Sequence, residues 1–370
     1  LRKVHEEIQP KMVELGLRIS QSKPVYDGLK AIQEGDEWGR LDEAQQRAIE
    51  NNIRQAEHAG VGLEGDEKER FLEISRELSK LSTDFSNHVL DARKQFELIV
   101  EGAVEVEGWP TTLRQVAAQS YNEARSSEDS AVSEDAAEAT PDGGPWRITL
   151  DYPSYLPFMQ HHRGRDQRET VYRAQMTLAS SGEFDNQDLI KRTLILRKER
   201  AALLGYDTFA DLSLASKMAP GVSAVLQMFE DLSAPSQPHA KSDLSALEDL
   251  AKTSGQGETL AHWDVGFWSE RLRESLFDYT DEQLRPYFPL PRVLDGLFSL
   301  AERLFDVTIE RADGEAPVWH EDVGYFKVSD SSTGEQMASF YLDPYSRPSE
   351  KRGGAWMAGC LDRRIVNGKV

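Results

Sequence analysis

The chain is organised around the stretch Phe340-Tyr341-Leu342-Asp343-Pro344-Tyr345-Ser346-Arg347-Pro348-Ser349-Glu350-Lys351-Arg352-Gly353-Gly354-Ala355-Trp356-Met357. It starts as an aromatic, alternating strand, breaks at Pro344, crosses a charged turn and restarts through a Gly-Gly pair. Glycines before a short apolar run let another backbone approach closely, as when a sheet edge receives an extended peptide. A surface hairpin with a basic loop is the plainer interpretation, because Gly and Pro mostly mark turns.

Composition narrows the classes of partner. Acidic residues outnumber basic ones by 64 to 43 along the 370 residues, which gives a formal net charge of −21. Nucleic acids and anionic membranes bind basic surfaces, so we expect neither as a partner. The single cysteine, Cys360, excludes an internal disulfide and fits a reducing compartment. No apolar run reaches the length of a membrane span. Because the chain opens on Leu1 and ends on Val370 without a stop signal, we expect both ends to be cuts through a longer protein.

Apolar side chains spaced three or four residues apart predict helices along most of the chain. The predicted helices cover residues 1–22, 26–34, 41–59, about 66–95, 165–179, 186–204, 208–214, 222–232, 241–254 and 293–305, with an aromatic-rich stretch at 259–276. In the longest helix a heptad-like seam runs through Phe71, Ile74, Leu78, Leu81, Phe85 and Val89. Packing against helices of the same chain is favoured over a coiled-coil dimer, since only three heptads are sustained.

Alternating patterns predict a few strands. Strands at 97–107 and 146–150 would form a β-hairpin-like excursion around 97–150, with Leu98, Val100, Val104 and Val106 on one face. Within it, residues 126–144 hold six acidic and no basic side chains, which predicts a mobile loop. Strands at 318–328 and 336–342 flank a polar turn at 330–334. The predicted fold class is therefore mainly α, multi-helical, with a small antiparallel β-sheet near the C-terminal end.

Several long runs accompany the opening stretch, and together they carry a resemblance. They are Leu-Asp-Glu-Ala-Gln-Gln at 41–46, Ala-Ser-Ser-Gly-Glu-Phe-Asp-Asn at 179–186, Ser-Lys-Met-Ala-Pro at 216–220 and Glu-Gln-Leu-Arg-Pro-Tyr-Phe at 282–288. In this order the runs resemble the thimet oligopeptidase and oligopeptidase A family of zinc metallopeptidases, and plant-type members above all. The resemblance covers nearly the whole chain and departs from the family's pattern after Met357.

The resemblance implies an organisation and an activity. An N-terminal helical domain at 1–160 would carry the acidic loop, and 161–370 would be the N-terminal part of the peptidase catalytic domain, truncated before the zinc site. The whole protein would be a zinc metallo-endopeptidase, or oligopeptidase, that hydrolyses short peptides. A cytoplasmic location is expected, with an organellar one left open by the missing N-terminus. The missing C-terminal half of its own catalytic domain would be a partner.

The resemblance also implies which residues would contact substrate. The Gly-Gly-Ala-Trp segment is expected to flank the zinc and to pair with the peptide backbone, with two tyrosines as neighbours. The candidate substrate-binding residues are Gly353, Gly354, Ala355, Trp356, Tyr341 and Tyr345. A purely structural role of these residues in the sheet is the alternative.

The zinc motif of this family, His-Glu-x-x-His, is absent from the chain. The closest segments begin at His320 and His5, but Gly324 and Gln9 stand where the second imidazole is needed. The prediction is therefore no catalytic residue, no metal ligand and no zinc bound to this chain, with the catalytic zinc, its base and its third ligand beyond Val370. The fragment alone is predicted to be inactive. A non-catalytic helical peptide-binding or scaffold protein derived from the family is the alternative.

Two further predictions concern histidines. The adjacent pair His161 and His162 is expected at the surface, because neighbouring side chains on a helix point apart. His262 lies among aromatic residues, which favours a core or interface position.

Overall fold

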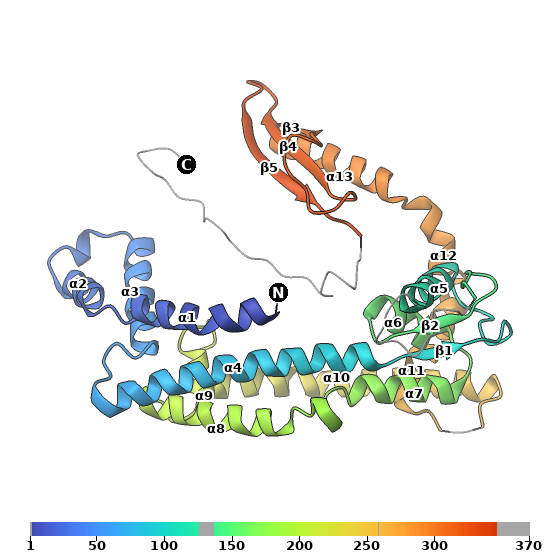
Figure 1. Cartoon of the computed structure of the whole chain (residues 1–370), viewed down its shortest axis with the longest axis horizontal. Coiled ribbons are helices and arrows are strands. Elements are labelled where there is room, and N and C mark those ends of the chain that lie inside the picture. The colour runs from blue at the N-terminus through green and yellow to red at the C-terminus, as the bar shows by residue number, and fades with distance from the viewer. Residues whose placement is uncertain (1, 126–136, 258, 346–370) are drawn as a thin grey trace. The chain divides into compact units, whose positions relative to one another are not determined.

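The structure, a computed structural model, describes residues 2–125, 137–257 and 259–345 (Figure 1). The chain divides into two compact units, each assembled from two separate stretches of sequence. Unit 1 takes 1–97 and 172–260, and unit 2 takes 98–171 and 261–370. The predicted mainly helical fold, with a small antiparallel sheet near the C-terminal end, is confirmed. The division at residue 160 and the mobility of the acidic loop stay predictions, and residues 126–136 of that loop lie outside the described part.

Unit 1 is entirely helical in its described part. Its elements are α1 (Arg2–Ser20), α2 (Lys23–Glu34), η1 (Trp38–Arg40), α3 (Glu43–His58), α4 (Gly65–Gln95), η2 (Gly182–Phe184), α8 (Gln187–Leu203), α9 (Phe209–Leu214) and α10 (Val222–Thr253). The long helix α4 lies beside α8 and α1 (Figure 1). Phe71 and Ile74, which open its predicted seam, are buried. The first part of the seam therefore packs within the chain, as predicted, whereas Phe85 further along it is exposed.

Two bidentate ion pairs fix the register of α4 against α8. The Arg70 guanidinium donates to both carboxylate oxygens of Glu199 over 2.6 and 2.8 Å. Further along, the Arg192 guanidinium donates to both oxygens of Glu77 over 2.5 and 2.8 Å. Residue numbers rise in one helix while they fall in the other, so the helices are antiparallel. The fork geometry of Arg favours one relative position of the two backbones, although exposed pairs add little free energy.

Helix α10 corrects a prediction. The sequence predicted two helices, 222–232 and 241–254, with a break between them, but one helix runs through Pro235 and Pro238. Each proline removes one backbone N–H from the helical ladder. This part of α10 is exposed, so water can bind the carbonyl groups that lose their partners. The helix therefore continues where proline in a buried helix would have ended it.

Unit 2 combines helices with two small sheets. Its elements are β1 (Leu98–Val100), α5 (Thr111–Arg125), β2 (Trp146–Ile148), α6 (Tyr152–His161), α11 (His262–Phe277), α12 (Asp281–Leu284), η3 (Arg285–Tyr287), α13 (Leu290–Phe305), β3 (Val307–Arg311), β4 (Gly324–Asp330) and β5 (Gln336–Leu342). Helix α7 (Arg165–Met176) begins in unit 2 and ends in unit 1.

The excursion around 97–150 is partly as predicted. Strands β1 and β2 pair in antiparallel register, with Val100 opposite Trp146. The predicted strand 97–107 is wrong beyond Val100, because the backbone enters successive turns and the Glu105 carboxylate accepts from the Gly102 N–H over 3.2 Å. Val106 is buried and Val104 is exposed, so the two valines do not share a face.

Helices α5 and α6 were not predicted. Ala118 is buried in α5, and the other four buried residues recur at spacings of four, four and three: Leu113, Ala117, Tyr121 and Ala124. That spacing indicates a helix, but the prediction treated residues 97–150 as one hairpin-like excursion and so missed it. Helix α6 holds Pro157 in its interior and a second proline in its first turn, where proline is tolerated. Proline content alone was thus a poor guide to where helices end.

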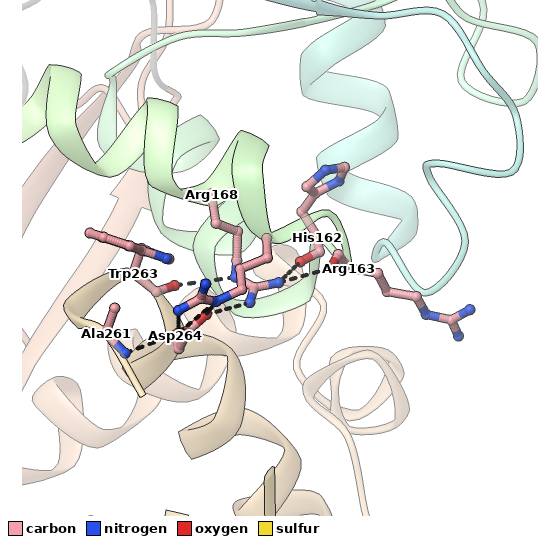
Figure 2. A network of polar contacts seen from close by, with 7 residues as sticks. His162, Arg163, Arg168, Ala261, Trp263 and Asp264 are labelled. Carbon is pink, nitrogen blue, oxygen red and sulfur yellow. Dashed lines mark hydrogen bonds and ion pairs between the residues drawn. The ribbon is translucent and has the colours of Figure 1, made fainter. Parts of the chain in front are cut away.

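Arg168 joins three segments of unit 2 (Figure 2). Its side chain is buried, and its Nη2 donates to Asp264 Oδ1 over 2.8 Å. Nη1 donates to the carbonyl oxygens of His162 and Arg163 over 2.8 and 3.0 Å. Nε donates to the carbonyl of Trp263 over 3.2 Å. One side chain on α7 therefore holds the turn after α6 and the start of α11.

Asp264 is the acceptor at the centre of the same network. Its buried carboxylate also accepts from Arg165, whose Nη2 lies 3.0 Å from Oδ2. The backbone N–H of Ala261, the N-cap residue of α11, donates to Oδ2 over 3.0 Å, so Asp264 also caps the N-terminus of this helix. Burial by itself raises the pKa of Asp264, but these donors outweigh it and lower the pKa below its usual value. The carboxylate is therefore ionised and paired in the folded chain.

His162 lies in the core, so its predicted surface position is wrong. The Trp109 indole N–H donates to His162 Nδ1 over 3.2 Å. Because Nδ1 accepts, Nε2 carries the proton and donates to Gln167 Oε1 over 2.6 Å. The ring stacks on Phe158 with centroids 4.4 Å apart. Burial lowers the pKa of His162, which keeps the imidazole neutral. His262, predicted in a core or interface, is exposed.

We predict that Asp264→Asn destabilises unit 2 strongly. The change leaves the buried Arg168 guanidinium, and the partly exposed Arg165, without their anion, and removing one partner of a buried pair costs about 3–5 kcal/mol. Denaturant-induced unfolding measures the loss. Asp188→Asn removes the exposed partner of Lys191 and is the matched control, with an expected change below about 1 kcal/mol. Equal losses in the two variants would contradict the central position of this ion pair.

We also predict that acid destabilises the fold through His162. The unfolded chain binds a proton at about pH 6.5 that the buried imidazole does not bind, so the unfolding free energy falls as the pH drops below that value. In His162→Gln the slope of stability against pH between about 6.5 and 5 should be shallower. A residual slope is expected from His58, whose pKa burial also lowers. An unchanged slope in the variant would refute the prediction.

Candidate functional site

The predicted C-terminal sheet has three antiparallel strands in the order β3, β4, β5 (Figure 1). Strand β5 has the predicted bounds. Strand β4 begins later than the predicted strand 318–328, because the Val323 N–H donates to the His320 carbonyl and closes a turn there. Strand β3 was not predicted. Among the described residues, β5 has a neighbour on one side only.

The polar turn 330–334 sets the pairing of β4 with β5. The Asp330 carboxylate accepts from the hydroxyl and backbone N–H of Ser332, over 2.6 and 2.9 Å, and from Thr333. These hydrogen bonds lower the pKa of Asp330 to about 2. Gly334 has a φ of +71°, a conformation that a residue with a side chain rarely adopts. The turn is thus locally determined, as the sequence predicted.

One face of the sheet packs on helix α13. Phe326 and Phe340 lie opposite each other on β4 and β5 and stack with ring centroids 5.1 Å apart. Phe298 of α13 contacts both rings, at 5.2 and 6.0 Å. Because successive side chains in a strand alternate between faces, the next pair along must point away from α13.

That next pair belongs to an aromatic cluster on the other face. Tyr325 and Tyr341 are directly opposite in the register, with ring centroids 5.0 Å apart. Trp319, from the turn before β4, lies 5.3 Å from the Tyr341 ring. Its indole N–H donates to Asp343 Oδ2 over 3.1 Å. We call Trp319, Tyr325 and Tyr341 the aromatic patch.

The predicted substrate-binding residues fall partly on this sheet. Tyr341 belongs to the aromatic patch, and Tyr345 follows β5 with its side chain about half exposed. Gly353, Gly354, Ala355 and Trp356 lie outside the described residues, so their predicted role is untested. Sequence reasoning missed Trp319 and Tyr325. The alternation of the segment 318–328 placed Tyr325 in a strand, but only the cross-strand register brings it to Tyr341.

The described residues do not supply a metal site. No group of three or more His, Cys, Asp or Glu side chains is arranged to hold a metal ion in the part of the chain that the structure describes. The Nδ1 atom of His320 lies 3.6 Å from Oδ2 of Asp322. A structural or catalytic zinc site needs at least three protein ligands. Within the described ranges, no helix has the length and apolarity to cross a lipid bilayer.

Comparison with known proteins gives the same family over most of the chain. Residues 158–369 match peptidase family M3, and residues 1–68 match the N-terminal domain of neurolysin and thimet oligopeptidase. The chain is 48% identical to organellar oligopeptidase A, chloroplastic/mitochondrial, of Arabidopsis thaliana, over 99% of this chain and 45% of that protein. It is 49% identical to a probable cytosolic oligopeptidase A of the same plant, over 99% of this chain and 51% of the relative. It is 35% identical to oligopeptidase A of Escherichia coli (strain K12), over 98% and 51%.

The chain belongs to peptidase family M3. The resemblance drawn from the sequence runs is thereby confirmed. The chain spans about half the length of these curated relatives.

Proposed function

We propose that this chain is part of a zinc metallo-endopeptidase that hydrolyses short peptides. The match of residues 158–369 to peptidase family M3 carries the proposal. Zinc in such enzymes polarises the scissile carbonyl and activates a water molecule. Because the sequence holds no His-Glu-x-x-His motif, our proposal places the metal, its ligands and the catalytic base on polypeptide outside this chain. This chain would bind and orient the peptide.

Peptide binding would use the segment that follows β5. We propose that Gly353, Gly354, Ala355 and Trp356 pair with the peptide backbone, beside the tyrosines of the preceding stretch. Strand addition to a sheet relies on backbone hydrogen bonds, which depend little on the peptide sequence. The one-sided pairing of β5 among the described residues and the exposure of Tyr341 support this assignment. Such binding suits an enzyme of broad specificity for short peptides.

The partner that completes the enzyme would be the C-terminal half of the catalytic domain. Helix α13 supports this part of the proposal, because it carries a second apolar stripe besides the face that covers the sheet. The exposed stripe recurs at spacings of three and four: Leu290, Val293, Leu297, Leu300 and Leu304. An exposed stripe of this kind marks a surface for another packed element.

For location, we propose the cytoplasm, with an organelle as the alternative. One of the plant relatives is described as cytosolic and another as chloroplastic or mitochondrial.

A non-catalytic peptide-binding or scaffold protein is the second candidate function. The lack of a metal donor set among the described residues favours it. A His-Glu-x-x-His motif in coding sequence that continues past residue 370 would support the peptidase. A stop codon at that point would support the binding protein.

We predict that the 370-residue chain alone does not hydrolyse peptides. A quenched fluorescent peptide, assayed with added zinc and with a chelator, measures this directly. The physical reason is that the sequence has no His-Glu-x-x-His motif, which would place two imidazoles on one helix face to hold the metal. The peptide should stay uncleaved, with no rise in fluorescence, both with added zinc and with the chelator. Turnover that zinc supports and the chelator abolishes would refute the assignment of the metal to another part of the protein.

We predict that the chain binds short peptides through the backbone of Gly354. Gly354→Pro removes the N–H that would pair with the peptide, so the dissociation constant for an end-blocked polyalanine peptide should rise about tenfold. Fluorescence polarisation of the labelled peptide measures it. Gly368→Pro makes the same change in the same terminal segment at a position with no proposed role, and it should bind as the unmodified chain does. Equal affinity of both variants would contradict the assignment.

A further inference from the structure

The connection between β1 and α5, residues 101–109, is held on unit 2 by side chains. It consists of successive turns, and backbone hydrogen bonds such as that from the Trp109 N–H to the Val106 carbonyl, over 3.1 Å, close these turns from within the segment. The pairing of β1 with β2 ends at Val100 and does not continue into it. Val106 and Trp109 are nevertheless buried, at 2% and 4% exposed. Side-chain contacts therefore decide whether segment 101–109 stays in place.

His162 lies at the centre of those contacts. The Trp109 indole N–H donates to its Nδ1 over 3.2 Å, and the two rings meet edge to face with centroids 5.6 Å apart. The second ring nitrogen, Nε2, donates to Gln167 Oε1 over 2.6 Å. The Gln167 amide in turn donates to Glu105 Oε2 over 2.8 Å. The imidazole thus reaches segment 101–109 twice, once directly and once through Gln167.

Two further contacts attach the segment. Arg163 Nη1 donates to Glu107 over 2.9 Å, but both side chains are exposed, and such pairs add little free energy. The Arg114 guanidinium of α5 donates to the Val106 carbonyl over 3.2 Å. Among the side chains in these contacts, the imidazole is the one whose ordinary pKa lies near neutral pH.

The turn that carries His162 is fixed independently of the segment. Arg168 Nη1 donates to the carbonyl oxygens of His162 and Arg163 over 2.8 and 3.0 Å (Figure 2). The same guanidinium is paired with Asp264 of α11. Phe158 of α6 stacks on the imidazole. Loss of the contacts to segment 101–109 would therefore leave this turn in place.

Protonation of the ring sets two donors against each other. Neutral imidazole has one N–H and one acceptor nitrogen, and here the acceptor Nδ1 receives the Trp109 indole. Imidazolium carries a proton on both nitrogens, so Nδ1–H would point at the indole N–H. His162 is 1% exposed, and a charge at such a position has no water to solvate it. Moving segment 101–109 away relieves both penalties, because it separates the two donors and admits water to the ring.

We propose that His162 is a pH-sensitive switch that controls the attachment of segment 101–109. Neutral His162 holds Trp109 in the core, and the protonated ring releases the segment while α6, α7 and α11 stay packed. Release uncovers Trp146, a fully buried neighbour whose ring centroid lies 6.3 Å from that of Trp109. The switch does not depend on the proposed peptidase function, because its contacts all lie within unit 2.

Charged groups face the ring from the elements packed against it. Burial is the largest influence and lowers the pKa of His162, whereas the hydrogen bond to Gln167 raises it. The Arg168 charge on α7 lowers this pKa and the Glu105 charge raises it, and the net result is a lowering. Asp264 of α11 is paired with Arg168. The attached segment therefore favours the neutral ring.

Acid favours the released form. Once the segment has moved away, the ring is solvated and its pKa is near the ordinary value of about 6.5, above that of the attached ring. The released form therefore binds the proton first as the pH falls. At about pH 5.5 an ordinary imidazole is protonated about ten times more often than it is neutral. The ratio of released to attached segment should thus rise about tenfold between about pH 7.5 and 5.5.

Hydrogen exchange measured by mass spectrometry tests the switch in the full 370-residue chain. Exchange of segment 101–109 is compared at about pH 7.5 and 5.5, with each rate divided by the intrinsic rate of an unprotected amide at that pH. The protection of the segment should fall about tenfold at the lower pH. Protection of α11 should stay the same, because the pair of Arg168 and Asp264 holds that helix in both forms.

Three variants assign the response to one hydrogen bond. His162→Gln removes the titrating group, so the protection of the segment should no longer depend on pH. His161→Gln changes the neighbouring imidazole, whose Nδ1 lies 3.1 Å from Arg271 Nη2, and should keep the full response. Trp109→Phe keeps a ring in the core but lacks the indole N–H that opposes the protonated imidazole. Its response should be smaller than that of the unmodified chain, and it decides the matter if His162→Gln does not fold.

Four results would overturn the switch. An equal response in His162→Gln would assign the titration to another group. Unchanged protection in the unmodified chain would show that segment 101–109 stays attached in acid. A loss of protection in α11 as large as that in the segment would show unfolding of the unit instead of local release. An undiminished response in Trp109→Phe would exclude the bond between indole and imidazole as the controlling contact.

Discussion

The buried ion pair between Arg168 and Asp264 is the interaction on which unit 2 depends. Its 2.8 Å contact joins α7 to α11, helices that are almost a hundred residues apart in sequence. Charges taken out of water are tolerated only when their remaining hydrogen-bonding groups are also satisfied. Arg168 meets this condition with three backbone carbonyls, and Asp264 meets it with a second arginine and a backbone N–H. Replacing Asp264 leaves the buried Arg168 guanidinium without a carboxylate, whereas replacing Arg168 leaves Asp264 with Arg165 as its remaining cation.

The candidate site depends on a different principle, the alternation of side chains along a strand. The same two strands present phenylalanines to α13 and tyrosines to the opposite face. Packing of Phe326 and Phe340 under α13 therefore determines the direction of Tyr325 and Tyr341. A shift of register by one residue would exchange the two sets and destroy both the core and the aromatic patch. The register that buries the two phenylalanines and stabilises the sheet therefore also determines which rings form the aromatic patch.

Local patterns predicted well where local forces decide. The seam of α4, the bounds of β5 and the turn at Asp330 all follow from the spacing or chemistry of neighbouring residues. Predictions failed where solvent or distant contacts decide. Pro235 and Pro238 did not break α10, because that part of the helix is exposed to water. His162 was assigned to the surface, yet Trp109 and Phe158 enclose it in the core.

The sequence by itself determined the mainly helical class, the membership of peptidase family M3 and the absence of a His-Glu-x-x-His motif from these residues. These follow from the periodicity of apolar residues and from the order of long residue runs, and both are properties of the sequence that do not depend on tertiary contacts. Only the tertiary structure decided that Arg168 meets Asp264 and that Trp319 joins Tyr341. The physical reason is that such pairs are distant in sequence or lie across strands. Nothing in the local pattern of either partner specifies the other, and the packing of the whole unit selects them.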